Sequence, residues 1–294
     1  MKEYKMQVKK YFYKTADFFN KDKKARYISE TLGNRNSYMN EVFYKLYKKE
    51  IESLKTTGNT ALLYIAGACE HHSASRDCIQ VLKGAMPVKS QLGYIASKTA
   101  KRMGNISYLS INANACASSL YALKEAKELL NQGFDDVLIY GEEWVEEVEL
   151  MLFKQLNIDL VCSDGFFILQ LTNNCNNPIA TIENVNWIWN NDKSPFEVTK
   201  EGYINSMLPF KDKQIDLIKM HGSGTAQNDK AELEAINELF ENIARIEYKS
   251  QIGHSQGVST GVELCKLLEE QKDKSVLVNA SGLGNFYGSC YVRL

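Results

Sequence analysis

The chain has 294 residues, of which 44% are hydrophobic and 24% charged, an ordinary composition for a globular protein. Its net charge of −1 gives no reason to expect a nucleic-acid partner, and no apolar run reaches the roughly 18 residues that a membrane span needs. The N-terminus lacks the apolar stretch of a signal peptide, so we expect a cytoplasmic protein whose seven cysteines are reduced thiols.

The first 60 residues are predicted to form a helical segment, because Tyr38, Val42 and Leu46 recur at helical spacing. After this segment, short apolar runs alternate with amphipathic stretches. The apolar runs predict strands at 61–68, 106–112, 136–141, 166–171, 180–189, 214–220, 244–250, 275–280 and 289–294. The amphipathic stretches predict helices at 88–104, 118–133, 229–243 and 258–271, and Asp229 and Glu232 are spaced as a capping box.

Strands alternate with helices on both sides of residue 190, which predicts an α/β fold with mostly buried sheets. The elements follow a similar order in the two parts, which suggests a duplicated unit. We therefore divide the chain into a helical N-terminal segment (1–60), an N-terminal half (61–189) and a C-terminal half (190–294).

Cys116 lies between a predicted strand and a predicted helix. The free N–H groups and the dipole at a helix N-terminus favour a thiolate, so we expect a lowered pKa for this thiol. The same N–H groups could also hold a developing oxyanion. A buried structural cysteine is the alternative, and it is the more common case for a single cysteine.

Two of the four histidines, His221 and His254, lie in glycine-rich loops that follow predicted strands, where open α/β sheets bind ligands. Lys249 precedes His254 and could set the protonation state of a histidine through its charge. Each of these residues, taken alone, could be an ordinary surface side chain. Together with Cys116 they supply the groups that thioester chemistry requires, and we expect the thiol and the two imidazoles to share one pocket.

A partial metal-ligand pattern occurs at Cys69, His71, His72 and Cys78, but it lacks the paired spacing of a zinc site. We therefore expect no bound metal. The glycines at 222–224 and 282–284 do not form a nucleotide-binding fingerprint.

Four stretches, in this order, resemble the β-ketoacyl synthases, the condensing enzymes of the thiolase fold. The resemblance covers about residues 61–294 and rests on NACASSLYAL (114–123), HGSGT (221–225), KSQIGHSQG (249–257) and NASGLGN (279–285). It implies a thiolase-like fold in which two similar βαβ halves form α-β-α-β-α layers, here with the extra helical N-terminal segment.

The resemblance also implies a set of catalytic residues. Cys116 would take an acyl group from an acyl carrier protein, and His221 and His254 would hold the thioester carbonyl of a malonyl-carrier substrate during decarboxylation. Lys249 would orient and tune His221. The backbone N–H groups of Cys116 and Leu283 would form the oxyanion hole.

The substrate side is implied in the same way. Ser223 and Thr225 would hydrogen-bond the phosphopantetheine arm, and Leu283 and Gly284 would line its binding site. The chain would bind no cofactor of its own, because phosphopantetheine belongs to the acyl carrier protein. The resemblance implies decarboxylative condensation to 3-oxoacyl-carrier protein and CO2, in fatty-acid-, polyketide- or polyene-like biosynthesis, by a homodimer or a heterodimer with another ketosynthase subunit.

Two alternatives stay open. The chain is shorter than typical members, and Ser281 and Leu283 stand where the family commonly has phenylalanines. These departures favour, as one alternative, a subunit like a chain-length factor, a partner in a heterodimeric ketosynthase with little or no activity of its own. The other alternative is a small-molecule-binding module with an inert thiolase fold.

Overall fold

The computed structural model describes residues 5–67, 71–84, 88–191 and 193–294 of the chain. They form a mixed α/β fold. Its strands are β1 (Met6–Thr15), β2 (Phe18–Asn20), β3 (Ala25–Tyr27), β4 (Thr60–Ile65), β5 (Ile106–Asn112), β6 (Asp136–Glu143), β7 (Cys162–Ser163), β8 (Gly165–Thr172), β9 (Ala180–Trp189), β10 (Leu217–Lys219), β11 (Ala244–Ile246), β12 (Ser275–Gly282) and β13 (Phe286–Arg293).

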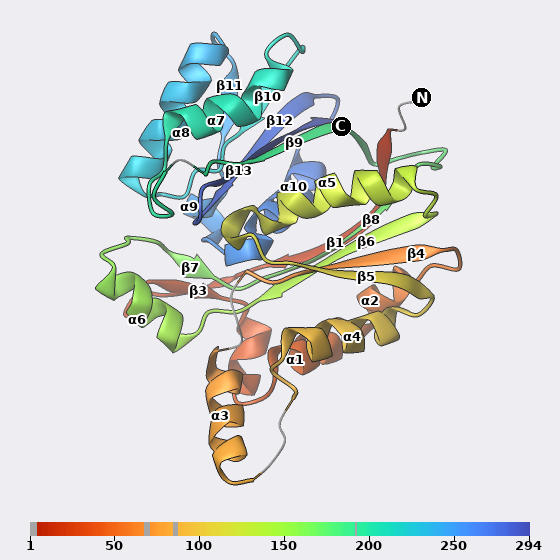
Figure 1. The fold of residues 1–294 in the computed structure, drawn as a ribbon, viewed down its shortest axis with the longest axis vertical. Coiled ribbons are helices and arrows are strands. Elements are labelled where there is room, and N and C mark those ends of the chain that lie inside the picture. The colour runs from red at the N-terminus through yellow and green to blue at the C-terminus, as the bar shows by residue number, and fades with distance from the viewer. Residues whose placement is uncertain (1–4, 68–70, 85–87, 192) are drawn as a thin grey trace.

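The helices flank these strands on several sides (Figure 1). They are α1 (Met39–Leu46), α2 (Lys48–Ser53), α3 (His71–Leu82), α4 (Leu92–Met103), α5 (Ser118–Asn131), α6 (Glu147–Gln155), α7 (Lys200–Met207), α8 (Ala226–Leu239), α9 (Lys249–Ile252) and α10 (Ser259–Glu270). In the described ranges, no helix is both long and apolar enough to cross a membrane.

One ten-stranded sheet runs through the described residues in the order β11-β10-β12-β13-β9-β1-β8-β6-β4-β5. Figure 1 shows that this sheet bends around α5 and α10, so that the two helices lie between its two parts. The largest apolar core fills this space and includes Leu120, Leu123 and Leu264. Helices α1, α2 and α4 cover the outer face of one part, and α7 and α8 cover that of the other. The α-β-α-β-α layering is therefore present.

The N-terminal prediction is wrong for residues 6–27, which form strands. The helical prediction holds only for 39–53, where α1 and α2 lie. β1 pairs antiparallel with β8 along its length and with β9 at Met6–Val8. Its partner residues lie 150 residues or more further along the chain, so local periodicity could not reveal them. Strand pairing in the tertiary fold overrides the local pattern here.

Most of the other predicted elements are confirmed, with shifted ends. The strands at 106–112 and 180–189 coincide with β5 and β9. The strand predicted at 244–250 ends at Ile246, and Lys249 instead begins the short helix α9. The helix predicted at 229–243 runs from Ala226 to Leu239. The helices α3, α6 and α7 were not predicted, and the division of the chain at residues 61 and 190 stays a prediction.

Candidate active site

Cys116 lies in a 3-10 turn (Ala115–Ala117) that joins β5 to α5. Ala115 has a φ of 48°, in the left-handed region that non-glycine residues seldom adopt. The Ser118 hydroxyl closes the turn, because it accepts a hydrogen bond from the Asn114 N–H (2.7 Å) and donates one to the Ala115 carbonyl (2.6 Å). The turn places Cys116 two residues before Ser118, the first residue of α5.

The backbone of Cys116 lies against the end of β12, where the turn to β13 begins. A Cβ atom added to Gly282 would lie 3.1 Å from Cys116 N and 2.8 Å from Asn114 O, so only glycine fits there without a shift. Leu283 follows Gly282 directly in the chain. The two N–H groups that sequence assigned to an oxyanion hole therefore come from segments in close contact.

His254 lies before a second turn of the same kind. In that turn Gln256 has a φ of 48°, and the Ser259 hydroxyl accepts a hydrogen bond from the Ser255 N–H at 2.8 Å. α10 then begins at Ser259, as α5 begins at Ser118. The backbone of His254 is held by Val161, whose carbonyl accepts its N–H at 2.7 Å. Two turns of the same kind thus position a thiol and an imidazole.

His221 follows the parallel strand β10, and α8 holds its loop in place. Buried Glu232 of α8 accepts hydrogen bonds from the N–H groups of His221 (2.7 Å) and Gly222 (2.9 Å). Asn279 of β12 donates a third at 3.1 Å. The predicted capping box is therefore wrong, because Glu232 lies within α8 and satisfies the N–H groups of the His221 loop rather than those of its own helix.

Lys249 is buried and anchored on two sides. Its ammonium group donates to the His221 carbonyl at 2.6 Å and lies 2.7 Å from a carboxylate oxygen of Glu263. The other oxygen of Glu263 contacts the ammonium group of Lys219, which is also fully buried. A single carboxylate from α10 thus lies between two buried lysines beneath the site.

Both imidazoles are held in the neutral form. Their ring centroids are 5.8 Å apart at an interplanar angle of 79°. Burial, and then the charge of Lys249, lowers the pKa of His221 and of His254 well below the usual range. The Gln256 N–H donates to Nδ1 of His254 at 3.1 Å, so the proton of that neutral ring lies on Nε2.

The expected pKa of Cys116 is wrong in its direction. Burial raises the pKa of this thiol to about 11, and the opposing charge of Lys249 does not compensate. Desolvation of a thiolate thus outweighs the helix dipole that motivated the prediction. Cys116 is a neutral thiol at pH 7, and any reaction at its sulfur must also move a proton.

One cavity of about 250 Å³ brings the predicted side chains together. Cys116, His221 and His254 line it, together with Ser223, Thr225 and Leu283. Gly284 does not line it. Its N–H instead donates to the Pro195 carbonyl at 2.9 Å and so ties the β12–β13 turn to the preceding loop.

The cavity has a polar side and an apolar side. The hydroxyls of Ser223 and Thr225 are 2.8 Å apart and belong to the His221 loop. Phe153, Ile158 and Leu160 form an apolar wall that comes from α6 and the loop after it. Such a cavity can hold one molecule with a polar arm and an apolar end.

Glu149 of α6 supports the His254 loop and provides a pH-dependent test of stability. Its carboxylate accepts a hydrogen bond from the Gln256 side chain. Burial raises the pKa of this carboxyl from 4.5 to about 7. The folded state therefore binds the proton more tightly than the unfolded state, and stability from this group is lost as the pH rises from about 4.5 to 7.

Glu149→Gln is expected to remove this loss. Relative to the parent, the free energy of unfolding of the variant should rise between pH 5 and pH 8 by up to about 3 kcal/mol. Urea unfolding at the two pH values measures the difference. Glu147→Gln, which removes an exposed carboxylate from the same helix, controls for the change in net charge. An equal effect of Glu149→Gln at both pH values would contradict the assignment.

The partial metal pattern lies largely outside the described residues. Cys69 is not described, and neither are the side chains of His71 and His72. Among the described residues, no group of three or more His, Cys, Asp or Glu side chains is placed to hold a metal ion.

Sequence reasoning missed two supporting residues, Glu263 and Gln256. Glu263 lies between Val262 and Leu264, and all three are buried. The sequence does carry a signal for Glu263, which is a carboxylate within an otherwise apolar stretch of a predicted helix. Such a carboxylate is predicted to be buried, and a buried charge needs a partner of opposite charge. Gln256 carries no such signal, since its backbone N–H makes the contact with His254.

Residues 203–280 match the family model described as the β-ketoacyl synthase C-terminal domain, and this segment contains His221, Lys249 and His254. This part of the chain is similar to the C-terminal domain of the β-ketoacyl synthases. Two curated relatives, the probable polyketide synthases 22 and 23 of Dictyostelium discoideum, are each 22% identical over 135 residues. The match covers 43% of this chain and 5% of each relative, so the chain corresponds to a small part of those proteins.

Solved ketosynthase structures share the fold over nearly the whole chain. A type II polyketide ketosynthase in complex with its acyl-carrier protein matches with a TM-score of 0.78 and 16% identity, over 99% of both chains. The ishigamide ketosynthase/chain length factor matches with a TM-score of 0.78 and 14% identity, again over 99% of both. A ketosynthase from module 6 of the Bacillus subtilis 168 bacillaene synthase matches over 87% of this chain and 58% of its own, with a TM-score of 0.69 and 14% identity.

Proposed function

We propose that the chain is a β-ketoacyl synthase of the Cys-His-His type, an acyltransferase that forms a carbon–carbon bond. The observation that supports this most strongly is the single cavity lined by one thiol and two neutral imidazoles. An inert binding module has no need for this combination.

The first step transfers an acyl group to Cys116. The sulfur attacks the thioester carbonyl of an acyl carrier protein, a new C–S bond forms, and the phosphopantetheine thiol leaves. Because Cys116 is a neutral thiol, its proton leaves with the phosphopantetheine sulfur. The N–H groups of Cys116 and Leu283 stabilise the oxyanion, and Ser223 and Thr225 hydrogen-bond the polar arm.

The second step forms the new bond. His221 and His254 donate hydrogen bonds to the carbonyl of a malonyl thioester, and CO2 leaves as the negative charge moves onto that oxygen. The resulting enolate carbon attacks the acyl carbon on Cys116, and the C–S bond breaks to release 3-oxoacyl-carrier protein. The departing Cys116 sulfur takes up a proton from water and returns to the neutral thiol. A donating Nε2–H on His254 suits this role, since Nδ1 is already occupied by the Gln256 N–H.

Lys249 keeps the two histidines in the required state. Its charge disfavours a second positive charge nearby, so the rings stay neutral and their N–H groups stay available as donors. Its hydrogen bond to the His221 carbonyl fixes the loop. Lys249 acts through the histidines and is a positioning residue.

The test is incubation of the purified chain with acyl-[acyl carrier protein], followed by mass spectrometry of the intact protein and of its peptides. We expect one acyl adduct, located on Cys116, and release of 3-oxoacyl product when malonyl-carrier protein is added. The absence of an adduct with every acyl chain offered would exclude this function for the isolated chain.

The alternative is a partner subunit of a heterodimeric ketosynthase, and the edge strand β5 favours an assembly. In the described sheet, β5 pairs with β4 alone and exposes Tyr108, Leu109 and Ile111, at 36–39% of their surface. An apolar edge strand of this kind is a pairing site for another chain. A second copy or a related subunit could cover it. An active homodimer by size-exclusion chromatography would exclude the partner-subunit role, and acylation only after addition of a second ketosynthase subunit would support it.

A further inference from the structure

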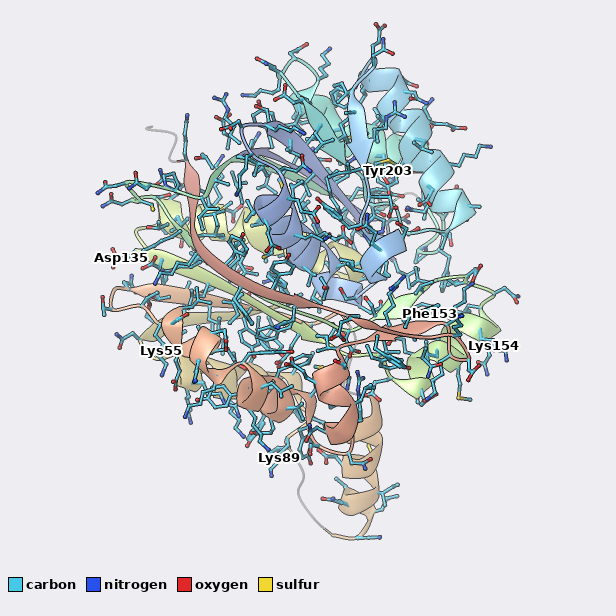
Figure 2. The ribbon with its side chains drawn as sticks, turned by 180° about the vertical axis from the view of Figure 1, so that it is seen from behind. Lys55, Lys89, Asp135, Phe153, Lys154 and Tyr203 are labelled. Carbon is cyan, nitrogen blue, oxygen red and sulfur yellow. The ribbon has the colours of Figure 1, made fainter. Side chains whose placement is uncertain are left out.

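Lys219 is the last residue of β10 and lies two residues before His221. Successive side chains of a strand point to opposite faces of its sheet. Ile218 packs on the outer face with Tyr203 of α7, which Figure 2 labels, whereas Leu217 packs in the core that contains α10. Lys219 shares the face of Leu217, so its side chain points toward α10 and is fully buried.

The buried ammonium group of Lys219 shares its anion with a second lysine. It contacts one carboxylate oxygen of Glu263, and the other oxygen lies 2.7 Å from the ammonium group of Lys249. Of the residues that the structure describes, no other carboxylate forms an ion pair with either lysine. When both lysines are protonated, two positive charges against one negative charge leave this cluster with a net charge of +1.

The other titratable groups near the cluster do not cancel this charge by contact. They come from α8, the loop after β11, the turn before α5, and β13, and they are Glu232, Asp229, Glu247, Cys116 and Cys290. The three carboxylates accept backbone N–H groups instead, at His221, Gly222, Gly224 and Ser250. Burial raises the pKa of the two thiols to about 11 and about 12, so they are neutral at pH 7.

The two imidazoles have no anion of their own. In the part of the chain that is described, Nδ1 of His221 has no hydrogen-bond partner, and Nδ1 of His254 accepts the N–H of Gln256. An imidazolium at either position would therefore lie unpaired beside a positive cluster, whose Lys249 already donates to the His221 carbonyl. Burial and the charge of Lys249 lower the pKa of both imidazoles, and the charge of Lys219 adds to this effect.

We propose that Lys219 is a positioning residue that keeps His221 and His254 neutral as the pH falls. It holds the second oxygen of Glu263, so that this carboxylate does not cancel the charge of Lys249 at the imidazoles. Without Lys219, the Lys249–Glu263 ion pair is close to neutral and acts on the histidines only as a dipole. This inference rests on the proposed function, because neutral N–H donors matter only if they bind a thioester carbonyl.

The first test measures CO2 release from malonyl-carrier protein between pH 4 and pH 8, because this step needs neutral histidines. Lys219→Met removes the charge and keeps a similar volume. It should move the acidic limb of the profile upward by about one pH unit, the effect of a unit charge about 10 Å away at an effective dielectric constant of about 20. At pH 8 the rate should equal that of the parent, since the imidazoles are neutral in both proteins.

Three further variants make the result specific. Lys219→Arg keeps the charge and should restore the profile of the parent. Lys219→Gln is a second neutral variant, so the result does not depend on one variant folding. Lys230→Met removes an exposed lysine of α8 and controls for net charge, and its profile should equal that of the parent because solvent screens that charge.

A second readout does not depend on activity. NMR titration of the full chain with labelled histidine measures protonation of each imidazole, and His221→Gln and His254→Gln assign the two resonances. The midpoints of both imidazoles should rise by about one pH unit in Lys219→Met and remain unchanged in Lys230→Met.

The outcomes are separable. If the midpoints rise in folded Lys219→Met but no thioester reacts with the parent, the proposed function fails and the role of Lys219 stands. If the folded neutral variants keep both the midpoints and the acidic limb of the parent, the inference is overturned while acylation of Cys116 is untouched.

Discussion

Replacement of Cys116 by alanine is expected to abolish acyl-enzyme formation and condensation, with a loss of about a thousandfold or more, because no other group can carry the acyl chain. The fold should persist, since the change removes one sulfur atom from a partly exposed position. Release of CO2 from malonyl-carrier protein should continue at a measurable rate, because His221 and His254 perform that step. Mass spectrometry of the carrier protein measures loss of CO2 from its malonyl group, and a coupled assay for 3-oxoacyl product measures condensation.

Two variants make this result specific. Cys78→Ala removes an exposed thiol from α3 and should keep full activity. His221→Ala should show the opposite division of activities, with Cys116 still acylated and decarboxylation lost. Retained condensation in the Cys116 variant would place the nucleophile elsewhere and would contradict the mechanism.

Glu263→Gln is expected to cause the largest loss of stability, about 3–5 kcal/mol, because it removes the carboxylate that lies between two buried ammonium groups. Folded domains are stable by only about 5–15 kcal/mol, so the melting temperature should fall by about 10 °C. If Lys249 loses its charge in this variant, the pKa values of the two histidines should rise, because that charge helps to lower them. Thermal and urea unfolding measure the loss.

Lys219→Met is the matched control. It removes one of the two lysines and leaves the Lys249–Glu263 ion pair intact. Burial, and then the charge of Lys249, lowers the pKa of Lys219, so its ammonium group costs free energy in the fold that the ion pair with Glu263 offsets. We expect a change within about 1 kcal/mol. A loss equal to that of Glu263→Gln would show that the charge of Lys219 is needed as much as the carboxylate, and would contradict this expectation.

The local sequence pattern was sufficient to predict an element wherever its own residues show the spacing of a strand or a helix. The strand at 106–112 alternates and ends in a polar loop, and the helix that follows Cys116 has apolar residues at helical spacing. These two elements alone place the cysteine at a strand–helix junction. The loops that hold His221 and His254 were found because glycine and polar residues interrupt the pattern directly after β10 and around α9.

The local sequence pattern failed to predict the structure where a segment depends on residues that are distant in the chain. β1 is a strand because β8 and β9 pair with it, and its own lysine-rich sequence does not predict that. Glu232 has the spacing of a cap, yet its carboxylate serves the His221 loop. The pKa of Cys116 was predicted from the helix dipole alone, which lowers it. Burial raises this pKa instead, and burial depends on all the residues packed around the cavity.

The sequence by itself determined the kinds of chemical group present, their order along the chain and the elements that carry them. Tertiary structure decided their distances, their protonation and the size of the space around them. The reason is physical. The periodicity of a helix or a strand spans only a few residues, so it is visible in the sequence. Burial and charge interactions occur between segments that meet only after folding. The apolar wall of Phe153, Ile158 and Leu160 is such a case, since the cavity that these residues line with Cys116 does not exist in the unfolded chain.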